Sequence, residues 1–535
     1  MKHKENTEVL VVGAGPVGMT AAILLASHGV RVTVVEKNPT TADDPKAISL
    51  DDESLRVYQR AGIADGIMRV IVPGTGTSYF GADGSRAFHA GAAVPYRFGF
   101  PFKNPFAQPD LEGVLRTALE EHPLVDLRFS TELTTLAQSE AEVTVELATP
   151  TGGESLSAAF VLAADGGRSH VRSLLRIPMT GRSHEDNWLV LDCLGDGHRE
   201  RYGMHHGDPR RPHVIVPGLH GRCRYEFYLH PGEGEATDAP PFELIERLLS
   251  PYRAIVPEQV ERAVIYRFHG LNADTWQSGR VFLLGDAAHM MPPFAGQGLN
   301  SGIRDAANLT WKVAEVLRGA ASMELLGSYT AERRPHAEAV IHSSERLGRV
   351  VMTTNPRLAA FRDRVIGKAL ESAAGRAFFE EMRYRPSPGL TSGVILDTDD
   401  HPLIGLALGQ PRVFDFNAHR ILPFDELTGT GWSVIGVGID SDEDWLRAIA
   451  AFAPLSPAHV DVPLDDLVRD RPEGVRIAID VDSRLYSEVA GARGRFLVMR
   501  PDRVIAGVVD PASIEDRADR LLHLAGRSAA TRALA

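Results

Sequence analysis

Hydrophobic and polar positions divide the chain into three regions with different rhythms. Near the N-terminus, and again from about residue 281, short apolar runs alternate with helical segments, which predicts βαβ units. From Asn187 to Phe268, strand-like runs follow one another with turns of Gly, Pro or Asp between them, which predicts a mostly antiparallel sheet. From about Val394, strands and helices alternate again, which predicts a small separate α/β domain.

The N-terminal region follows the pattern of a dinucleotide-binding unit. The apolar run Glu8–Val12 predicts a strand, the glycine-rich segment 13–18 (GAGPVG) follows it, and a helix of small residues then ends at Gly29. A second strand, Val30–Val35, ends on Glu36. A glycine motif alone is weak evidence, but here strand, helix, second strand and terminal acid stand in the required order. The region therefore predicts nucleotide binding.

Four residues of this unit have a stated physical role in such a site. Gly13 allows the tight turn, Gly15 lets a pyrophosphate approach the backbone, and Gly18 lets the helix pack closely on the strand. The carboxylate of Glu36 would accept hydrogen bonds from the adenosine ribose. This acid favours FAD or NAD over NADP at the site.

A second strand-acid-glycine segment lies at residues 281–312. Its strand-like run ends at Gly285-Asp286, a stretch rich in Ala, Pro and Gly follows, and a helical pattern begins at about Asn300. The free N–H groups and positive dipole end of this helix favour negative charge, and Gly296 and Gly298 let a flat ligand approach the backbone. An ordinary strand-loop-helix joint is the alternative for a Gly-Asp pair taken alone.

Further polar residues are weaker candidates for cofactor contacts. Asp165 ends another strand and begins the glycine-rich segment DGGRS, which also contains Gly166. Lys46 precedes one predicted helix, Arg56 lies within it, and Gln108 stands just before another. Surface solvation or helix capping is the alternative role for these last three side chains.

Charge and cysteine content narrow the class of protein. The formal net charge of −13 argues against nucleic-acid binding, which needs basic patches. Cys193 and Cys223, the two cysteines, fit neither a metal-ligand spacing nor a CxxC redox pair, so we expect no metal site and a reducing, cytoplasmic location. The apolar stretch Val9–Ser27 is interrupted by glycines and lacks a cleavage pattern, so we expect neither a signal peptide nor a membrane span.

Three stretches together resemble the motifs of one flavoprotein family. GAGPVG with Glu36, DGGRS at 165–169, and GDAAHMMPPFAGQGLNSGIRDAANLTWK at 285–312 are similar to those of single-component, FAD-dependent aromatic hydroxylases, the class A flavoprotein monooxygenases. Within this class the chain looks most like the 3-(3-hydroxyphenyl)propionate hydroxylase-like and phenol hydroxylase-type proteins. The segments that carry this closer likeness are AISLDDESLR, FAQPDLE, NSGIRDAANLTWK, EMRYRP and VMRPDRVIAG.

The resemblance implies an α/β fold of three parts. These are a Rossmann-type FAD-binding domain, an inserted and mostly antiparallel β-sheet substrate lobe, and a C-terminal thioredoxin-like α/β domain. The expected divisions are 1–77, 103–180 and 275–350 for the FAD-binding domain, 78–102 and 181–274 for the substrate lobe, 351–393 for a helical segment and linker, and 394–535 for the C-terminal domain. Because the last domain has no CxxC, we expect it to serve structure or assembly, and a homodimer is one such assembly.

The resemblance also implies roles for individual residues. Those expected to contact FAD are Gly13, Gly15, Pro16, Val17, Gly18, Glu36, Lys46, Arg56, Gln108, Asp165, Gly166, Gly285, Asp286, Pro293, Gly296, Gly298, Leu299 and Asn300. Those expected near the substrate are Trp188, Arg224, Tyr225 and Pro293, and for each a surface or core role is the alternative. One departure is Lys46, where the family commonly has Arg; Lys keeps the charge but loses the forked donors. No acid–base residue is assigned.

The chemistry of the family supplies the functional hypothesis. NADH or NADPH reduces FAD, the reduced flavin reacts with dioxygen to a C4a-hydroperoxide, and a phenolic substrate takes the distal oxygen. We therefore expect an aromatic hydroxylase, with a 3-(3-hydroxyphenyl)propionate-like phenol as the first substrate class. Two alternatives stay open: hydroxylation or Baeyer–Villiger oxygenation of a polycyclic polyketide or drug-like aromatic, and flavin binding without turnover. A flavin halogenase is disfavoured because no WxWxIP-type motif appears.

Overall fold

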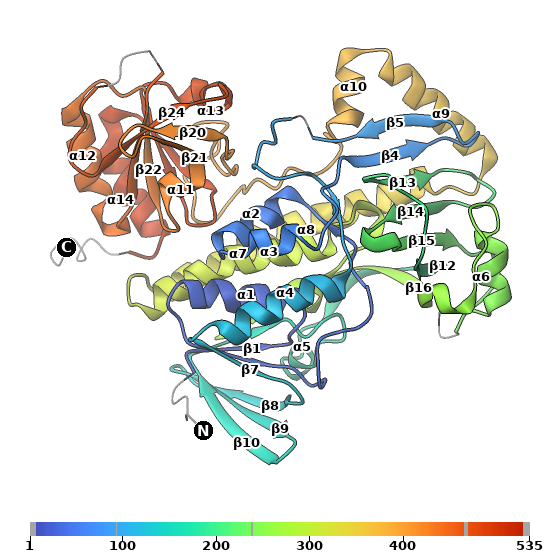
Figure 1. Ribbon diagram of the computed structural model, residues 1–535. Helices are drawn as coiled ribbons and strands as arrows, with labels where there is room; N and C mark the ends of the chain where they lie inside the picture. The colour runs from blue at the N-terminus through green and yellow to red at the C-terminus, as the bar shows by residue number, and fades with distance from the viewer. Residues whose placement is uncertain (1–6, 93, 237–238, 465–468, 528–535) are drawn as a thin grey trace. The chain divides into compact units, whose positions relative to one another are not determined.

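The computed structural model describes residues 7–92, 94–236, 239–464 and 469–527 (Figure 1). The chain divides into two compact units. Unit 1 comprises Met1–Ala93, Phe100–Ala306 and Ala337–Pro386, and unit 2 comprises Val94–Gly99, Ala307–His336 and Ser387–Ala535. Within the described ranges, no helix combines the length and the apolar character needed to cross a bilayer.

Unit 1 contains a six-stranded sheet with the order β17-β18-β11-β1-β2-β7, which is parallel except at β17. The continuous apolar runs form its inner strands, which are buried because both faces of such a sheet are covered. Helices α1 (Pro16–Ser27) and α4 (Gln108–Glu121) lie side by side against it (Figure 1). The strands are β1 (Val9–Val12), β2 (Val32–Val35), β7 (Val125–Arg128), β11 (Phe160–Ala163), β17 (Gln277–Ser278) and β18 (Val281–Leu283).

Shorter elements complete this part of unit 1. An antiparallel three-stranded sheet follows β7, and helix α5 (His170–Leu174) follows β11. Its strands are β8 (Glu132–Gln138), β9 (Val143–Thr149) and β10 (Gly152–Ala158). The short strands β3 (Ser49–Leu50) and β6 (Asn104–Pro105) pair with each other, and helices α2 (Asp52–Arg60) and α3 (Ala64–Met68) follow β3. The Asp51 side chain caps α2 by accepting from the Ser54 backbone N–H, as expected for this helix start.

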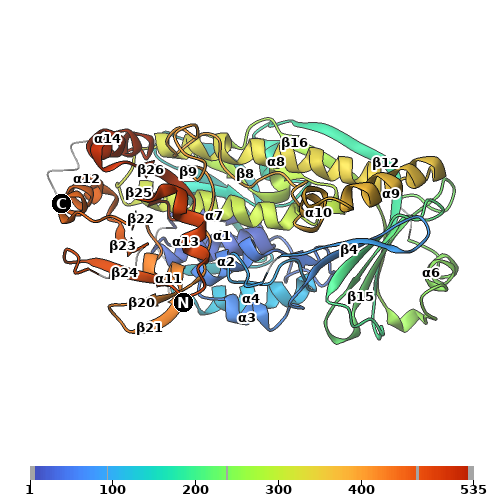
Figure 2. The ribbon, with the colours of Figure 1, turned by 90° about the horizontal axis from the view of Figure 1, so that it is seen from above.

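The second sheet of unit 1 has eight strands in the order β19-β16-β12-β15-β14-β13-β4-β5. All its pairs are antiparallel except β13 with β4, so the predicted antiparallel sheet is confirmed. The two longest strands, β12 and β16, run side by side along their length (Figures 1 and 2). The strands are β4 (Gly76–Phe80), β5 (Arg86–Ala90), β12 (Met179–Cys193), β13 (Tyr202–His206), β14 (His213–Pro217), β15 (Cys223–Tyr228), β16 (Val260–Ala273) and β19 (His289–Met290).

The two faces of this sheet have different coverings. On one face Leu189, Leu191, Ile215 and Phe227 form a core with helix α6 (Phe242–Leu249). Alternation along the strands places the next residues on the other face, which we call the inner face. It is defined by Thr77, Tyr79, Trp188, Val190, Asp192, His205, Val214, Val216, Arg224 and Glu226. Helices α9 (Pro356–Leu370) and α10 (Ala373–Glu380) contact β5.

Unit 2 is built on a seven-stranded mixed sheet with the order β21-β20-β24-β23-β22-β25-β26. Its strands are β20 (Arg412–Asp415), β21 (Arg420–Pro423), β22 (Ser433–Val437), β23 (Ala458–Val462), β24 (Val475–Asp480), β25 (Arg495–Met499) and β26 (Ile505–Val509). Its helices are α11 (Phe424–Thr428), α12 (Asp442–Phe452), α13 (Arg484–Val489) and α14 (Ile514–Leu524), of which α12 and α14 contact each other. From β20 to α14, strands and helices alternate as predicted for the region after about Val394. The unit boundary falls within α7 (Gly298–Leu317) and α8 (Glu324–Val351).

One buried ionic cluster lies in the core of unit 2. Arg500 donates to both carboxylate oxygens of Glu332 at 2.8 Å, and the Lys312 Nζ donates to Glu332 Oε2 at 2.7 Å. The side chains of all three residues are fully buried. Burial disfavours the charged carboxylate, but the charges of Arg500 and Lys312 outweigh it and hold the pKa of Glu332 below its usual range.

Candidate functional site

The glycine-rich turn between β1 and α1 is closely packed at two of its three glycines. Gly13 has a φ of +101°, and a Cβ there would lie 2.5 Å from the Ala164 carbonyl oxygen. A Cβ at Gly18 would lie 2.0 Å from the Gly13 carbonyl oxygen. At Gly15, by contrast, no other described atom lies within 4 Å of an added Cβ. The fold thus requires glycine at 13 and 18, whereas Gly15 faces open space at the start of α1, where an anion is favoured.

The acid that ends β2 is held in position by backbone donors. The Ala14 backbone N–H donates to Glu36 Oε2 at 2.9 Å, which joins the turn after β1 to the end of β2. The backbone and side-chain amides of Asn38 donate to Glu36 Oε1 at 3.0 and 2.6 Å. Glu36 is half-buried, so its remaining lone pairs can accept hydrogen bonds from a ribose.

The DGGRS segment lies beside this turn because β11 pairs with β1. Val12 is opposite Ala163, and the next residues bring Asp165 close to Gly13. The Val171 backbone N–H donates to Asp165 Oδ2 at 3.1 Å, while Oδ1 is buried and has no hydrogen-bond partner among the described atoms. A buried acceptor in this state is costly, so it fits a donor group of a bound ligand. Gly166 has a φ of +82° and also faces open space.

The segment after β18 meets the same edge of the sheet. Gly285, with a φ of +56°, lies against the start of α1, since a Cβ there would be 3.1 Å from the side chain of Val17. Asp286 is exposed, yet the surrounding protein raises the pKa of its carboxyl, against the opposing charges of His289 and Lys46. An accessible carboxylate with protein on most sides of it fits a side chain that faces a ligand.

The N-terminus of α7 is fastened to the loop before α2 by Asn300. Its Oδ1 accepts from the Asp51 backbone N–H at 3.0 Å and from the Ser54 hydroxyl at 2.8 Å. Its Nδ2 donates to the carbonyls of Ser49 at 3.0 Å and Gly296 at 2.7 Å. α7 begins at Gly298, slightly earlier than expected, and an added Cβ at Gly298 would meet open space. Asn300 therefore shapes the loop that Pro293, Gly296 and Leu299 form.

We expect Asn300→Ala to lower the free energy of unfolding by about 1–3 kcal/mol, because four hydrogen bonds, two buried and two partly buried, lose their partner. Urea unfolding followed by circular dichroism measures this change. Glu120→Ala is the control variant. It lies on α4 and not on α7, and it removes only a surface ion pair with Arg116, so it should change stability little. A loss for Asn300→Ala no greater than that of the control would contradict the expectation.

Of the remaining cofactor candidates, Gln108 contacts the segment around Lys46. Gln108 begins α4, with Pro109 in the first turn. Its Oε1 accepts from the Ala47 backbone N–H at 2.8 Å, and its Nε2 donates to Glu112 Oε1 at 2.6 Å. Lys46 is exposed, and its charge acts on Asp286. Arg56 is buried within α2. The Gln108 amide is thus engaged in holding the loop.

Arg224 joins the inner face of the eight-stranded sheet to this same loop. Its Nε and Nη2 donate to the two carboxylate oxygens of Asp192 at 2.7 and 2.9 Å, and Nη1 donates to the Lys46 carbonyl at 2.7 Å. It also donates to the Pro45 carbonyl. Burial raises the pKa of the neighbouring Glu226, although the charge of Arg224 opposes this effect. Sequence patterns did not single out Asp192 or Glu226.

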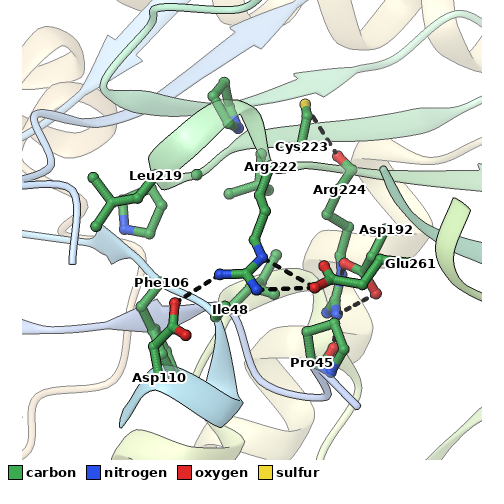
Figure 3. A pocket seen from close by; sticks show the side chains of 15 residues that line it. Pro45, Ile48, Phe106, Asp110, Asp192, Leu219, Arg222, Cys223, Arg224 and Glu261 are labelled. Carbon is green, nitrogen blue, oxygen red and sulfur yellow. Dashed lines mark hydrogen bonds and ion pairs between the residues drawn. The ribbon is translucent and has the colours of Figure 1, made fainter. Parts of the chain in front are cut away.

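A pocket opens next to Arg224 (Figure 3). Ile48 and Phe106 supply apolar surface on one side, and Leu219 does so on the other (Figure 3). Its charged side chains bind one another: Arg222 donates to Asp110 at 2.8 Å and to Glu261 at 3.0 Å. The full lining is Pro45, Ile48, Pro105, Phe106, Ala107, Asp110, Asp192, Val216, Pro217, Gly218, Leu219, Arg222, Cys223, Arg224 and Glu261.

The other expected substrate residues fall on different faces. Trp188 is buried on the inner face, where its ring centroid lies 5.6 Å from that of Phe294, the neighbour of Pro293. Tyr225 points to the opposite face, packs against Phe227 and donates its hydroxyl to Asp196 at 2.9 Å. Strand alternation therefore groups Trp188 with Arg224 and separates Tyr225 from both.

Two family models match the chain. Residues 6–344 match the family described as FAD binding domain, and residues 405–524 match the HcaD C-terminal domain. A 3-(3-hydroxy-phenyl)propionate/3-hydroxycinnamic acid hydroxylase of Mycolicibacterium smegmatis is 35% identical over 97% of this chain and 93% of its own length. The same-named protein of Mycolicibacterium gilvum is 36% identical over 95% of this chain and 90% of its own.

Solved structures share the fold along nearly the whole chain. The flavin-dependent monooxygenase PieE, in complex with FAD and substrate, superposes with a TM-score of 0.79 at 21% identity, over 98% of this chain and all of that one. Aklavinone-11 hydroxylase with FAD and aklavinone gives 0.75 at 24% identity, over 98% and 100%.

The chain belongs to the FAD-binding-domain family of flavoprotein monooxygenases. Within that class it is an FAD-dependent aromatic hydroxylase that uses NAD(P)H as co-substrate.

Proposed function

We propose that this enzyme hydroxylates a small phenol that carries a carboxylate side chain, of the 3-(3-hydroxyphenyl)propionate or 3-hydroxycinnamate kind. The observation that carries the proposal is the near-full-length match to hydroxylases with these substrates in their names. The inner face supports it, because its apolar side chains offer an aromatic ring a water-poor surface. The alternative is a polycyclic aromatic such as aklavinone, which is bound in the structure of aklavinone-11 hydroxylase.

The residues expected around FAD have separate tasks in this proposal. When bound, FAD supplies the redox chemistry with NAD(P)H and dioxygen. The turn at Gly15 and the start of α1 would bind the pyrophosphate, and Glu36 would bind the adenosine ribose. Asp286 would accept hydrogen bonds from the ribityl and pyrophosphate region. The start of α7 at Gly298 would direct its N–H groups and positive dipole end at the edge of the flavin ring, which favours negative charge there.

The experiment is turnover by the purified holoenzyme with NADH or NADPH, oxygen, and either 3-(3-hydroxyphenyl)propionate or a polycyclic aromatic. We expect the small acid to accelerate oxidation of the nicotinamide and to yield a product with one added oxygen atom. Hydrogen peroxide is measured in parallel, because uncoupled oxidation consumes the nicotinamide without hydroxylation. Coupled turnover of the polycyclic compound alone would favour the alternative, and peroxide as sole product with both would contradict the proposal.

Several expectations from the sequence stay proposals beside this one. The division into FAD-binding domain, substrate lobe, linker and C-terminal domain is supported by the change of sheet type along the chain. A thioredoxin-like fold of the last domain is supported by its mixed sheet with flanking helices. The two buried free cysteines fit a reducing, cytoplasmic location. Light scattering on the holoenzyme tests the expected homodimer.

A further inference from the structure

Basic and hydroxyl side chains gather at the β4–β13 part of the inner face. Thr77 and Tyr79 stand on β4, and His205 on β13 is paired with Tyr79. The Lys103 Nζ donates to Thr77 Oγ1 at 3.2 Å. The hydroxyls of Tyr79 and Tyr384 form a hydrogen bond at 3.1 Å. Four separate parts of unit 1 thus meet at one place.

Arg385 adds a second cation to this group. Its guanidinium carbon lies 5.3 Å from the centroid of the Phe102 ring, next to Lys103 in the chain. Its charge acts on Lys103, on His205 and on both tyrosines. We call these five residues, Tyr79, Lys103, His205, Tyr384 and Arg385, the basic cluster.

Two members of the basic cluster, Lys103 and His205, are buried at a cost in free energy. Lys103 is 8% exposed and His205 is 7% exposed. Burial, together with the charge of Arg385, holds the pKa of Lys103 well below its usual range. Burial and the charge of Lys103 likewise lower the pKa of His205, whose Nδ1 has no hydrogen-bond partner among the described atoms. A bound anion would offset the repulsion between the cations and give this nitrogen a partner.

The carboxylate that acts on Lys103 is already engaged elsewhere. This carboxylate is Asp51, which accepts from Arg304 and from the Ser54 backbone N–H. Burial disfavours its charged form, but the guanidinium of Arg304 and these hydrogen bonds outweigh burial and lower the pKa of Asp51. The backbone of Asp51 is bound to Asn300, so the basic cluster lies close to the start of α7.

An apolar surface joins the basic cluster to the loop at Pro293. Tyr79, Trp188 and Val214 of the inner face belong to one hydrophobic cluster with Phe294 of this loop. An aromatic ring bound on this surface would have the proposed flavin site at one end and the basic cluster at the other.

We propose that the basic cluster binds the carboxylate of the aromatic substrate, with Lys103 and Arg385 supplying charge and Tyr79, Tyr384 and His205 supplying hydrogen bonds. This inference rests on the proposed function, since it names the residues that select an acidic phenol over a neutral one. Arg385 and Lys103 bind differently: a guanidinium offers two parallel donors, whereas an ammonium acts as a point charge. The basic cluster therefore fixes the orientation of the ring as well as its affinity.

The test compares an acidic phenol with a neutral one of matched size, 3-(3-hydroxyphenyl)propionate against 3-propylphenol. Binding to the oxidised holoenzyme is measured from the change in flavin absorbance, and kcat/KM is measured separately. In the wild-type enzyme we expect Kd to be at least about tenfold lower for the acid, because each tenfold corresponds to about 1.4 kcal/mol of charge-assisted binding. In Lys103→Met and in Arg385→Met we expect this preference to disappear while the affinity for 3-propylphenol is kept.

The controls separate the ways in which this inference can fail. Arg210→Met removes an exposed cation and should keep the preference for the acid. Equal Kd values for the two phenols in the wild-type enzyme would overturn the inference even if both variants failed to fold, and hydroxylation of either phenol would leave the enzyme class intact. Loss of both ligands in the folded variants would also overturn it, since it would assign the basic cluster a structural role. Failure of the wild-type enzyme to hydroxylate either phenol would instead contradict the proposed function.

Discussion

We expect Gly15→Ala to yield a folded protein that binds FAD much more weakly than the wild type. The added methyl group meets no other described atom within 4 Å, and the backbone there has a φ of −74°, which alanine adopts without strain. The apoprotein should therefore unfold at an unchanged denaturant concentration. The same methyl group would occupy the space expected for the pyrophosphate, so we expect FAD affinity to fall at least about a hundredfold, or about 2.8 kcal/mol. Flavin fluorescence titration of the apoprotein measures this loss.

Gly18→Ala adds the same methyl group to the same turn, but at a position where the fold leaves no space for it. Its methyl group would lie 2.0 Å from the Gly13 carbonyl oxygen, so helix α1 must shift and the apoprotein itself should be destabilised. A Gly15→Ala protein that binds FAD as tightly as the wild type would place the pyrophosphate elsewhere. A Gly15→Ala apoprotein as unstable as Gly18→Ala would contradict the open space described at this turn.

We expect Glu332→Ala to lower the free energy of unfolding of unit 2 by about 3–5 kcal/mol, because it leaves Arg500 and Lys312 buried without their shared carboxylate. Chemical denaturation followed by the fluorescence of Trp311, Trp432 and Trp445, the tryptophans of unit 2, measures the loss. Glu515→Ala removes one partner of an exposed ion pair with Arg447 and should change stability little.

The contribution of Glu332 depends on pH in a defined direction. Its folded-state pKa lies below the value of 4.5 taken for an unperturbed glutamate, so the carboxylate stabilises the folded state above that pH. As the pH falls towards the folded-state pKa, this stability is lost. The difference between the wild-type protein and Glu332→Ala should therefore shrink in acid, and a difference that is constant with pH would contradict this account.

Sequence patterns predicted those parts of the fold that are determined by residues close together in the chain. The fingerprint around Gly13, the antiparallel sheet between Asn187 and Phe268, and the helix that contains Arg56 each follow from residues close together in the chain. Strands β8 and β10 lack this signal, because most of their side chains are exposed and no buried face imposes an apolar alternation.

In the candidate site, too, only residues with a local sequence signal could be proposed from the sequence. Glycines and terminal acids carry a recognisable spacing, so the sequence could nominate them as candidates, and the structure brings the turn at Gly13 together with Glu36 and Asp165. Lys103, His205 and Arg385 come from three distant parts of the chain, and each alone looks like a surface residue. Their relation arises from the register between β4 and β13 and from the path of the chain after α10, which no local pattern encodes.

The two thiols of the chain can report on the opening of the eight-stranded sheet. Cys193 and Cys223 stand opposite each other on β12 and β15, and burial raises the pKa of the Cys193 thiol to about 12 and that of Cys223 as well. Neither should react with an alkylating reagent while unit 1 is folded, because the thiolate is the reactive form. The sequence of unit 2 contains no cysteine. Pulsed alkylation therefore measures the opening of unit 1 alone, and the opening of unit 2 gives no alkylation signal.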